Sequence, residues 1–256
     1  MLAGQRHQLI LQVLQSDGYA TVGDLAGQLG ASVATVRRDL VKLEDDGLLT
    51  RIYGGAVTGD QRPPFAEAAE VRVSEKDTIA AEAAAMVEDG QSIILDAGTT
   101  VHHLARHLHG RRLTVITNSL AVYEELAHDE NIALMLLGGM VIRQCHALDG
   151  FMTEDNLRQV HADWLFMSAA GVRPGGQVMD TTVVEIPAKR AMIAASDKVA
   201  LVADASKFPG TGMAKVCGPQ DLDVVVTNPL SDTTTCTALE QMDVRVVQTT
   251  PVAAAR

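Results

Sequence analysis

Short apolar runs rich in β-forming residues alternate with helix-length amphipathic stretches from residue 75 onward, and this alternation limits the fold more than any other feature of the sequence. Strands separated by helices in this way form a mainly parallel sheet that helices cover. The sequence therefore predicts an α/β domain with a mainly parallel, Rossmann-like sheet. The expected strands are Ser92–Leu95, Thr114–Thr117, Ile132–Leu137, Trp164–Ser168, Val199–Val202, Val224–Thr227 and Val244–Val247.

The first 58 residues show a different pattern, because apolar residues repeat at helical spacing in three short segments. The second helix begins after Thr21 and stops at Gly30, and Ser32 is the expected N-cap of the third. Two short helices joined by a tight turn form a helix-turn-helix, whose second helix enters the major groove of DNA. The residues of that helix expected to pack inward are Val33, Val36, Leu40 and Leu43.

The opposite face of the same helix carries the candidate DNA contacts. Ala34 and Thr35 are small enough to allow close approach to the bases, and Arg38 is long enough for a bidentate contact to guanine. Arg37 and Lys42 are placed to hold phosphates, which fixes the register without reading the base sequence. An Arg-Arg pair on its own is more often the solvated face of a small helical bundle, so the spacing of the surrounding residues has to decide.

A β-type run follows this helix. It extends from Leu48 to Ala56 and contains a Gly54-Gly55 pair, which predicts a hairpin that would form the wing of a winged helix-turn-helix. Arg51 and Tyr53 would face the DNA backbone from this wing.

The DNA-binding signature of the DeoR family of bacterial transcriptional regulators resembles this part of the sequence. The resemblance implies a winged helix-turn-helix whose paired arginines, Arg37 and Arg38, meet operator DNA. The matching residues are Ser32-Val33-Ala34-Thr35-Val36-Arg37-Arg38-Asp39-Leu40, then Leu43, Gly47, Arg51, Tyr53 and Gly54-Gly55-Ala56.

The charge distribution limits how DNA can be bound. A formal net charge of −11 argues against a protein that coats nucleic acid, because such proteins carry a basic surface. Residues 1–56 hold five basic and six acidic side chains, so most of the acidity lies in the rest of the chain. DNA contact must therefore come from the placement of a few basic groups.

A polar, alanine-rich stretch with a Pro63-Pro64 pair separates the two patterns and has no clear period, as expected of a linker. We expect a DNA-binding domain at residues 1–58, a linker at 59–74, and an α/β effector-sensing and oligomerisation domain at 75–256.

The predicted strands end in small and polar residues, at the edge where parallel sheets bind ligands. The strand before Asp96 runs into Gly98-Thr99-Thr100 at the start of a helix, an arrangement that suits a phosphate. Lys76 and Lys207 could supply the countercharge. Ordinary tight turns are the alternative explanation of these loops. The other strand ends of this kind are Thr117-Asn118, Gly138-Gly139 and Ala170-Gly171.

This second region resembles the sensor domain of the same family, so the resemblance covers nearly the full chain. It implies a fold similar to sugar-phosphate isomerases and deaminases, and a repressor that a phosphorylated sugar or related metabolite releases from its operator. No cofactor is expected. The implied effector site comprises Lys76, Asp96, Gly98, Thr99, Thr100, Asn118, Gly139 and Lys207, with Glu185 and Lys189 near its mouth.

Two features depart from the family pattern. Pro187 interrupts the helix-forming run between Glu185 and Lys189, and Gln144-Cys145-His146 occupies a loop that varies among relatives. Both leave the identity of the effector open.

Other classes of protein are disfavoured. The N-terminal segment lacks the pattern of a signal peptide, and no apolar run is long enough to span a membrane, so we expect a cytoplasmic protein. The three scattered cysteines show no disulfide framework.

Two alternative functions remain to be tested. Asp96, Glu185 and Lys189 could act as acid and base in a sugar-phosphate isomerase or deaminase. His103 and His107, one helical turn apart, could bind the metal of a metal-responsive repressor, although no cysteine or acidic third ligand is close in sequence. A pure scaffold would leave the helix-turn-helix without a use. Symmetric operators imply that the chain assembles at least into a dimer, and a tetramer is equally compatible.

Overall fold

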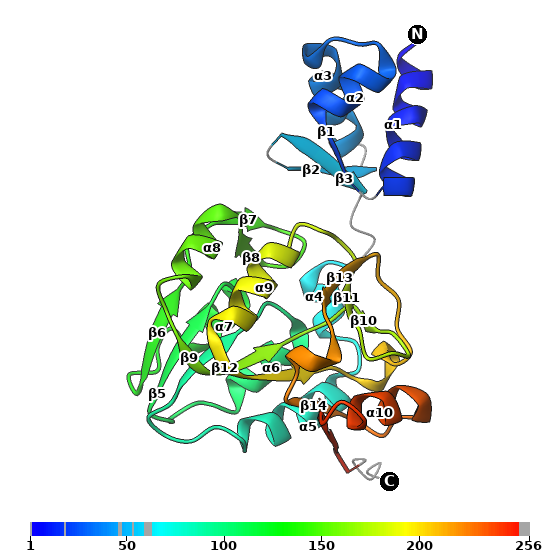
Figure 1. Ribbon diagram of the computed structural model, residues 1–256. Helices are drawn as coiled ribbons and strands as arrows, with labels where there is room; N and C mark the ends of the chain where they lie inside the picture. The colour runs from blue at the N-terminus through cyan, green and yellow to red at the C-terminus, as the bar shows by residue number, and fades with distance from the viewer. Residues whose placement is uncertain (1, 18, 46–47, 53, 59–62, 251–256) are drawn as a thin grey trace. The chain divides into compact units, whose positions relative to one another are not determined.

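The computed structural model describes residues 2–17, 19–45, 48–52, 54–58 and 63–250, which form two compact units. The first unit contains Met1–Arg62 and Thr181–Val184, and the second contains Pro63–Asp180 and Glu185–Arg256 (Figure 1). Each unit has its own core of buried apolar side chains.

The first unit is a winged helix-turn-helix, as predicted. Its elements are α1 (Ala3–Asp17), β1 (Tyr19–Thr21), α2 (Val22–Leu29), α3 (Val33–Asp45), β2 (Leu49–Ile52) and β3 (Gly55–Thr58). The strands form an antiparallel sheet with the order β1-β3-β2, of which β1 was not predicted. Thr21 Oγ1 caps α2 by accepting a hydrogen bond from the Asp24 N–H (3.0 Å), and Ser32 Oγ caps α3 by accepting one from the Thr35 N–H (3.1 Å).

The inward face of α3 differs from the prediction at one position. Val36, Leu40 and Leu43 are fully or almost fully buried, but Val33 is 45% exposed. The expectation for Val33 was wrong because it is the first residue of α3, where the core ends, although it lies on the same helical face.

The second unit contains a seven-stranded parallel sheet in which all seven predicted strands are present. They are β4 (Ser92–Leu95), β5 (Leu113–Thr117), β6 (Ile132–Leu136), β9 (Ala162–Met167), β12 (Ser196–Val202), β14 (Val224–Thr227) and β15 (Arg245–Gln248). The order in the sheet is β15-β14-β12-β9-β4-β5-β6. This arrangement confirms the predicted α/β fold class.

Helices cover both faces of this sheet. They are α4 (Phe65–Ala69), α5 (Val73–Ala84), α6 (Thr99–Arg106), α7 (Leu120–Leu126), α8 (Phe151–Leu157), α9 (Ile186–Ala194) and α10 (Thr233–Glu240). Side chains of α5, α6 and α7 share one core cluster with alternate residues of the strands, such as Ile93 and Leu95. On the opposite face, α9 packs against β9 and β12 (Figure 1).

The strand order reverses between β4 and β9. After β4 the chain adds β5 and β6 on one side, and it then crosses to add β9, β12, β14 and β15 on the other. A ligand site in an open parallel sheet lies at the carboxyl ends of the strands where the order reverses. We therefore expect a ligand site among the residues that follow β4 and β9.

Several short elements were not predicted from the sequence. They are the hairpin β7 (Met140–Ile142) and β8 (Ala147–Asp149), the antiparallel sheet of β10 (Gly171–Val172), β11 (Val178–Asp180) and β13 (Ala214–Cys217), and the 3₁₀ turn Ala205–Lys207. Helix α4 falls within the segment predicted as the linker. Pro187 does not interrupt a helix, because it lies in the first turn of α9, where a missing N–H costs no hydrogen bond.

Candidate functional site

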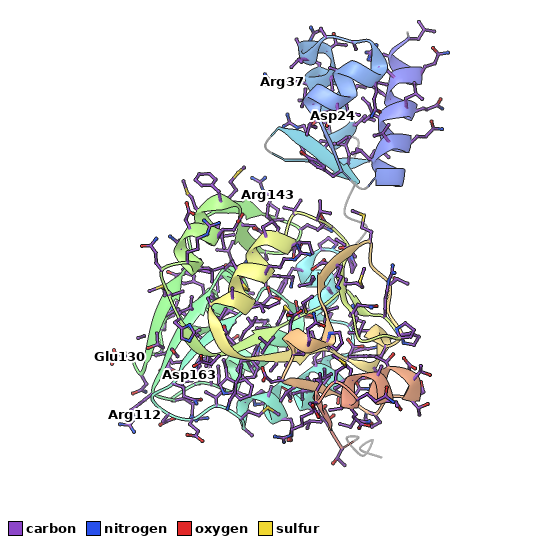
Figure 2. The ribbon with its side chains drawn as sticks, viewed as in Figure 1. Asp24, Arg37, Arg112, Glu130, Arg143 and Asp163 are labelled. Atoms are coloured by element: carbon purple, nitrogen blue, oxygen red, sulfur yellow. The ribbon has the colours of Figure 1, made fainter. Side chains whose placement is uncertain are left out.

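The outward face of α3 presents unpaired cations. Ala34, Arg37, Arg38 and Lys42 are exposed, and Thr35 is half-buried (Arg37 is labelled in Figure 2). Within the described part of the chain, no ion pair joins Arg37, Arg38 or Lys42 to an acidic group. These side chains are therefore available to an external anion.

The opposite face of α3 is anchored by a buried carboxylate. Asp39 accepts hydrogen bonds from Arg6 Nε (2.5 Å) and Arg6 Nη2 (2.9 Å), and its Oδ1 is 3.0 Å from His7 Nε2. The hydrogen bond from Arg6 lowers the pKa of Asp39, against the effect of burial. This contact fixes α3 to α1, so that Arg37 and Arg38 stay on the outside. No sequence pattern indicates this role of Asp39, because its partner Arg6 lies 33 residues away.

Arg51, in the wing, is paired with an acidic side chain, whereas Arg37 and Arg38 have no such partner among the described residues. The Arg51 N–H and Nε donate to the two carboxylate oxygens of Glu44, at 2.9 and 2.6 Å. A DNA phosphate would have to compete with Glu44 for this guanidinium. Tyr53 lies outside the described residues.

Asp96 is the centre of a buried polar cluster at the point where the strand order reverses. Its Oδ2 accepts hydrogen bonds from the Ser168 N–H (3.0 Å), from Ser168 Oγ (2.9 Å) and from Lys189 Nζ (2.5 Å). Lys189 Nζ also lies 3.8 Å from Asp180 Oδ2. Burial alone would lower the pKa of Lys189, but Asp96, Asp180 and Glu185 together raise it above its usual value. The lysine therefore stays charged, and it ties α9 to the ends of β4 and β9.

The loop after β4 can approach this cluster only because residue 98 is glycine. A Cβ on Gly98 would lie 2.6 Å from both Cβ and Oγ of Ser168, which no side chain tolerates. Helix α6 begins at Thr99, and the N–H groups of its first turn have no acceptor within the helix. Thr99 is half-buried and Thr100 is buried beside them. The loop thus presents backbone donors at the sheet edge, as an anion requires.

The residues after β5 and β6 join strand ends or allow close packing of the loops. Thr117 Oγ1 donates to Leu95 O (2.7 Å) and accepts from the Ser119 N–H (3.0 Å), so this hydroxyl joins neighbouring strand ends. The Gly138 N–H donates to Asn156 Oδ1 (2.8 Å). A Cβ on Gly139 would lie 2.6 Å from Thr153 Oγ1, so Gly139 serves close packing of the loop against α8.

Gly171 lies in β10, outside the main sheet, whereas Lys76 lies in α5 and Lys207 in the 3₁₀ turn after β12. A Cβ on Gly171 would lie 2.4 Å from Thr211 O, so this glycine permits two backbone segments to meet. Lys76 Nζ donates to Ala68 O (2.5 Å), and burial lowers the pKa of Lys76, with a further contribution from Lys207.

Lys76 and Lys207 belong to a cation cluster that also contains Arg72. The Arg72 guanidinium donates to Ser206 Oγ (3.0 Å) and lies 3.8 Å from Asp204, which follows β12. Strand β9 separates β12 from β4, so the cation cluster is two strands, roughly 10 Å, from the position of Asp96 along the same edge.

Asp149 lies beside the Asp96 cluster, although it was not among the residues predicted for the candidate site. It ends β8 and is buried, its Oδ1 accepts a hydrogen bond from the Gly150 N–H (2.6 Å), and burial raises its pKa to about 7, with a further contribution from Glu185. Glu185 in turn accepts a hydrogen bond from Cys145 Sγ (3.2 Å). No local sequence pattern predicts a role for Asp149, because β8 has only three residues and is not part of the main sheet.

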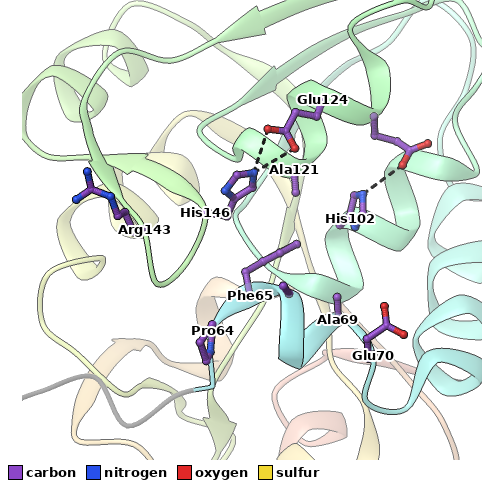
Figure 3. A pocket seen from close by; sticks show the side chains of 11 residues that line it. Pro64, Phe65, Ala69, Glu70, His102, Ala121, Glu124, Arg143 and His146 are labelled. Atoms are coloured by element: carbon purple, nitrogen blue, oxygen red, sulfur yellow. Dashed lines mark hydrogen bonds and ion pairs between the residues drawn. The ribbon is translucent and has the colours of Figure 1, made fainter. Parts of the chain in front are cut away.

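A separate open cavity of about 540 Å³ lies where α4, α6, α7 and the β7–β8 turn meet. In Figure 3, Phe65 lies between His102 and His146, and its ring centroid is 5.8 Å from that of each. The Phe65 N–H donates to Gln144 O in the β7–β8 turn (3.1 Å). His102 and His146 are backed by Glu125 and Glu124, at 3.2 and 3.1 Å. The contacts of Phe65 with Gln144 and His146 therefore connect α4 to the turn that precedes β8.

The histidines considered as metal ligands have an acidic neighbour. His107 Nε2 lies 2.9 Å and His103 Nδ1 3.6 Å from Asp77 Oδ1. Over the residues that the structure describes, no group of three or more His, Cys, Asp or Glu side chains is arranged to hold a metal ion. In the same part of the chain, no helix is both long and apolar enough to cross a bilayer.

Comparison with known proteins identifies both units. A family model of the DeoR-like helix-turn-helix domain matches residues 6–62, and one of the DeoR C terminal sensor domain matches residues 71–229. The transcriptional repressor AccR of Agrobacterium fabrum is 35% identical over 87% of this chain and 88% of its own. The HTH-type transcriptional regulator YulB of Bacillus subtilis is 34% identical over 96% of both chains. The glycerol-3-phosphate regulon repressor of Escherichia coli is 29% identical over 88% of this chain and 90% of its own. The chain therefore belongs to the DeoR family of transcriptional regulators.

Proposed function

We propose that this regulator represses a carbohydrate-metabolism operon and that a phosphorylated sugar or related metabolite releases it from its operator. The observation that carries the proposal is the cluster at the reversal of strand order, where Asp96, Gly98 and Lys189 are fixed beside the first turn of α6. The name of the E. coli relative, a glycerol-3-phosphate regulon repressor, supports an effector of this class.

The operator is bound through α3 and the wing. Arg38 reads a base edge, whereas Arg37 and Lys42 hold phosphates. Arg51 contributes less than these, because Glu44 partly neutralises it. The proposed DNA contacts are Ser32, Ala34, Thr35, Arg37, Arg38, Lys42, Arg51 and Tyr53. A symmetric operator requires two such units, so the functional form is a dimer or a tetramer.

The effector phosphate binds at the free N–H groups of α6, and Lys76 and Lys207 add countercharge from the neighbouring cluster. Burial lowers the pKa of Lys76, and the attraction to a bound anion would offset the cost of keeping the buried lysine charged. The proposed effector site comprises Lys76, Asp96, Gly98, Thr99, Thr100, Asn118, Glu185, Lys189 and Lys207. Thr117, Gly138, Gly139 and Gly171, predicted from the sequence as part of the same rim, hold the surrounding loops together and are not proposed to contact the effector.

Effector binding reaches the DNA-binding unit through α4. The β7–β8 turn contacts α4 through the Phe65 N–H and ring, and α4 is the first helix after the segment that leads from the first unit. A shift of β8 at the sheet edge would therefore move α4. Coupling of this kind requires that the effector binds the DNA-free form more tightly than the DNA-bound form.

The variant Phe65→Ala tests this route. We expect effector affinity and effector-free DNA affinity to stay within about threefold of wild type, while the factor by which effector weakens DNA binding falls at least about fivefold. Fluorescence anisotropy of labelled operator DNA, with and without effector, measures both. Tyr123→Ala, an exposed aromatic on α7 that does not line the cavity, is the matched control. Unchanged release of DNA by effector in Phe65→Ala would show that this contact does not transmit the signal.

The function itself is tested with DNA from the promoter region beside the protein's own gene. At fixed salt, the complex is titrated with ribose 5-phosphate, glucose 6-phosphate and glycerol 3-phosphate, and with the unphosphorylated parent compounds. We expect one phosphorylated compound to release the DNA and its parent to have no effect. If DNA binds and no phosphorylated compound acts, the effector class is wrong, and absence of specific DNA binding would contradict regulation at this promoter.

The geometry favours ligand binding over catalysis. Lys189 is held protonated by three carboxylates and so is not available as a base. A turnover assay with pentose and aminosugar phosphates should show no product.

A further inference from the structure

Among the described residues of the second unit, four buried side chains have an oxygen without a hydrogen-bond partner, namely Asn118, Asp149, Thr227 and Thr249. Only Asn118 and Asp149 lie next to the Asp96 cluster. Asp149 is 3% exposed, and its Oδ2 has no partner, although Oδ1 accepts from the Gly150 N–H. Asn118 is 4% exposed, and its Oδ1 has no partner, although Nδ2 donates to Leu148 O (2.9 Å). Leaving a buried acceptor without a donor is costly, so such atoms in native proteins have a functional or solvent partner.

Both oxygens lie where the end of β5 contacts β8. Asn118 follows β5 and is tied to β8 twice, because the Leu148 N–H also donates to Asn118 O (2.8 Å). Asp149 is the next residue of β8. The charges that act on the Asp149 carboxyl are those of Glu185 and Lys189 on α9 and Asp96 after β4, so both acceptors stand at the edge of the sheet that holds the Asp96 cluster.

The chemistry of the pair selects the group that binds there. Both free atoms are acceptors, and Asp149 and Glu185 would repel a phosphate. A hydroxyl group donates a hydrogen bond, carries no charge, and fits beside a carboxylate and an amide oxygen. The phosphate of the effector must then lie elsewhere, toward the N–H groups of α6 and the cations Lys76 and Lys207.

We propose that Asp149 Oδ2 and Asn118 Oδ1 form a hydroxyl-recognition site, which accepts hydrogen bonds from two hydroxyl groups of a polyhydroxylated effector and thereby selects among phosphorylated compounds. This inference rests on the proposed function, in which the phosphate is bound by other residues. It assigns Asp149 as a specificity-determining residue.

Calorimetric titration of the full-length protein tests the site. The probes are ribose 5-phosphate, glucose 6-phosphate, glycerol 3-phosphate, their unphosphorylated parents and inorganic phosphate, and the proteins are wild type, Asp149→Asn and Asp149→Ala. At pH 8, where Asp149 is ionised, we expect both variants to lose about 10- to 100-fold in affinity for the compound that wild type binds best, because a hydrogen bond to a charged acceptor is removed. Affinity for inorganic phosphate should stay within about twofold of wild type, since Asp149 does not contact the phosphate.

Asp197→Asn is the matched control, because Asp197 is an exposed carboxylate in β12 whose partner is His161. Folding of the variant is checked by its melting temperature. The raised pKa of Asp149 means that its ionisation costs stability as the pH rises toward 7, so the neutral Asp149→Asn protein should melt at or above the wild-type temperature at pH 8.

The outcomes separate the two proposals. Equal affinity of wild type and both variants for the best sugar phosphate would overturn the hydroxyl site and leave the proposed function intact. If wild type binds only an unphosphorylated sugar and the variants lose it, the phosphorylated effector is wrong and the hydroxyl site stands. Binding of none of the sugars or sugar phosphates by wild type would overturn both.

Discussion

Lys189→Met is expected to lower the free energy of unfolding by about 3–5 kcal/mol at pH 8, because it leaves buried carboxylates without their cation. Lys189 Nζ, on α9, donates a hydrogen bond to Asp96 and lies 3.8 Å from Asp180 Oδ2. Methionine fills a similar volume, so the loss reports charge and hydrogen bonding more than a cavity. Urea unfolding followed by circular dichroism measures the change.

The pH dependence of this loss has a definite sign. Without the lysine, the folded protein holds buried carboxylates with no cation beside them, and burial without a partner favours the protonated form of a carboxyl. In the unfolded chain, carboxyl groups ionise near pH 4. A carboxyl whose folded pKa is raised loses stability as the pH increases, so the deficit of Lys189→Met should shrink when the pH is lowered from 8 to 5.

Lys198→Met provides the control for removing a lysine. Lys198 is exposed in β12 and lies 5.1 Å from the centre of the Trp164 ring, an interaction worth about 1 kcal/mol or less at an exposed site. If the two variants unfold at the same urea concentration, the buried cluster does not depend on the charge of Lys189.

The length of an element decides whether the sequence predicts it. The seven strands of the main sheet follow from apolar runs that are long enough to be recognised, and each ends close to its predicted position. Loops after those strands could therefore be placed at one edge. Strands of two or three residues, such as β8 and β10, carry no periodic signal. The sequence therefore does not predict that residues of these short strands, such as Asp149, lie at the site.

The roles of individual side chains depend on contacts that no spacing encodes. Thr117 and Gly171 match a rim pattern, yet the Thr117 hydroxyl is engaged by Leu95 and Ser119, and Gly171 packs against the backbone of Thr211. Asp149 lacks any pattern, yet it combines deep burial with an unpaired oxygen. Burial and hydrogen-bond partners arise from residues far apart in sequence, and these decide which polar group remains available to a ligand.

Arg37→Ala/Arg38→Ala is expected to weaken binding to the operator about 30- to 1000-fold, since it removes one base contact and one phosphate contact. Both side chains are exposed and have no acidic partner among the described residues, so the melting temperature should not change. The single variants should differ. Arg38→Ala should relax the preference for one base position, whereas Arg37→Ala should weaken all sequences alike and reduce the salt dependence of binding by about one released ion.

A matched double variant distinguishes specific contact from net charge. Arg112→Ala/Arg158→Ala removes two exposed arginines from the second unit, where their side chains are 79% and 65% exposed (Arg112 is labelled in Figure 2). Both double variants change the net charge equally, so a general electrostatic effect would weaken DNA binding by the same factor in each. We expect the Arg112/Arg158 variant to bind operator within about threefold of wild type, because neither arginine belongs to the helix-turn-helix unit. Equal losses in the two variants would mean that α3 does not recognise the operator.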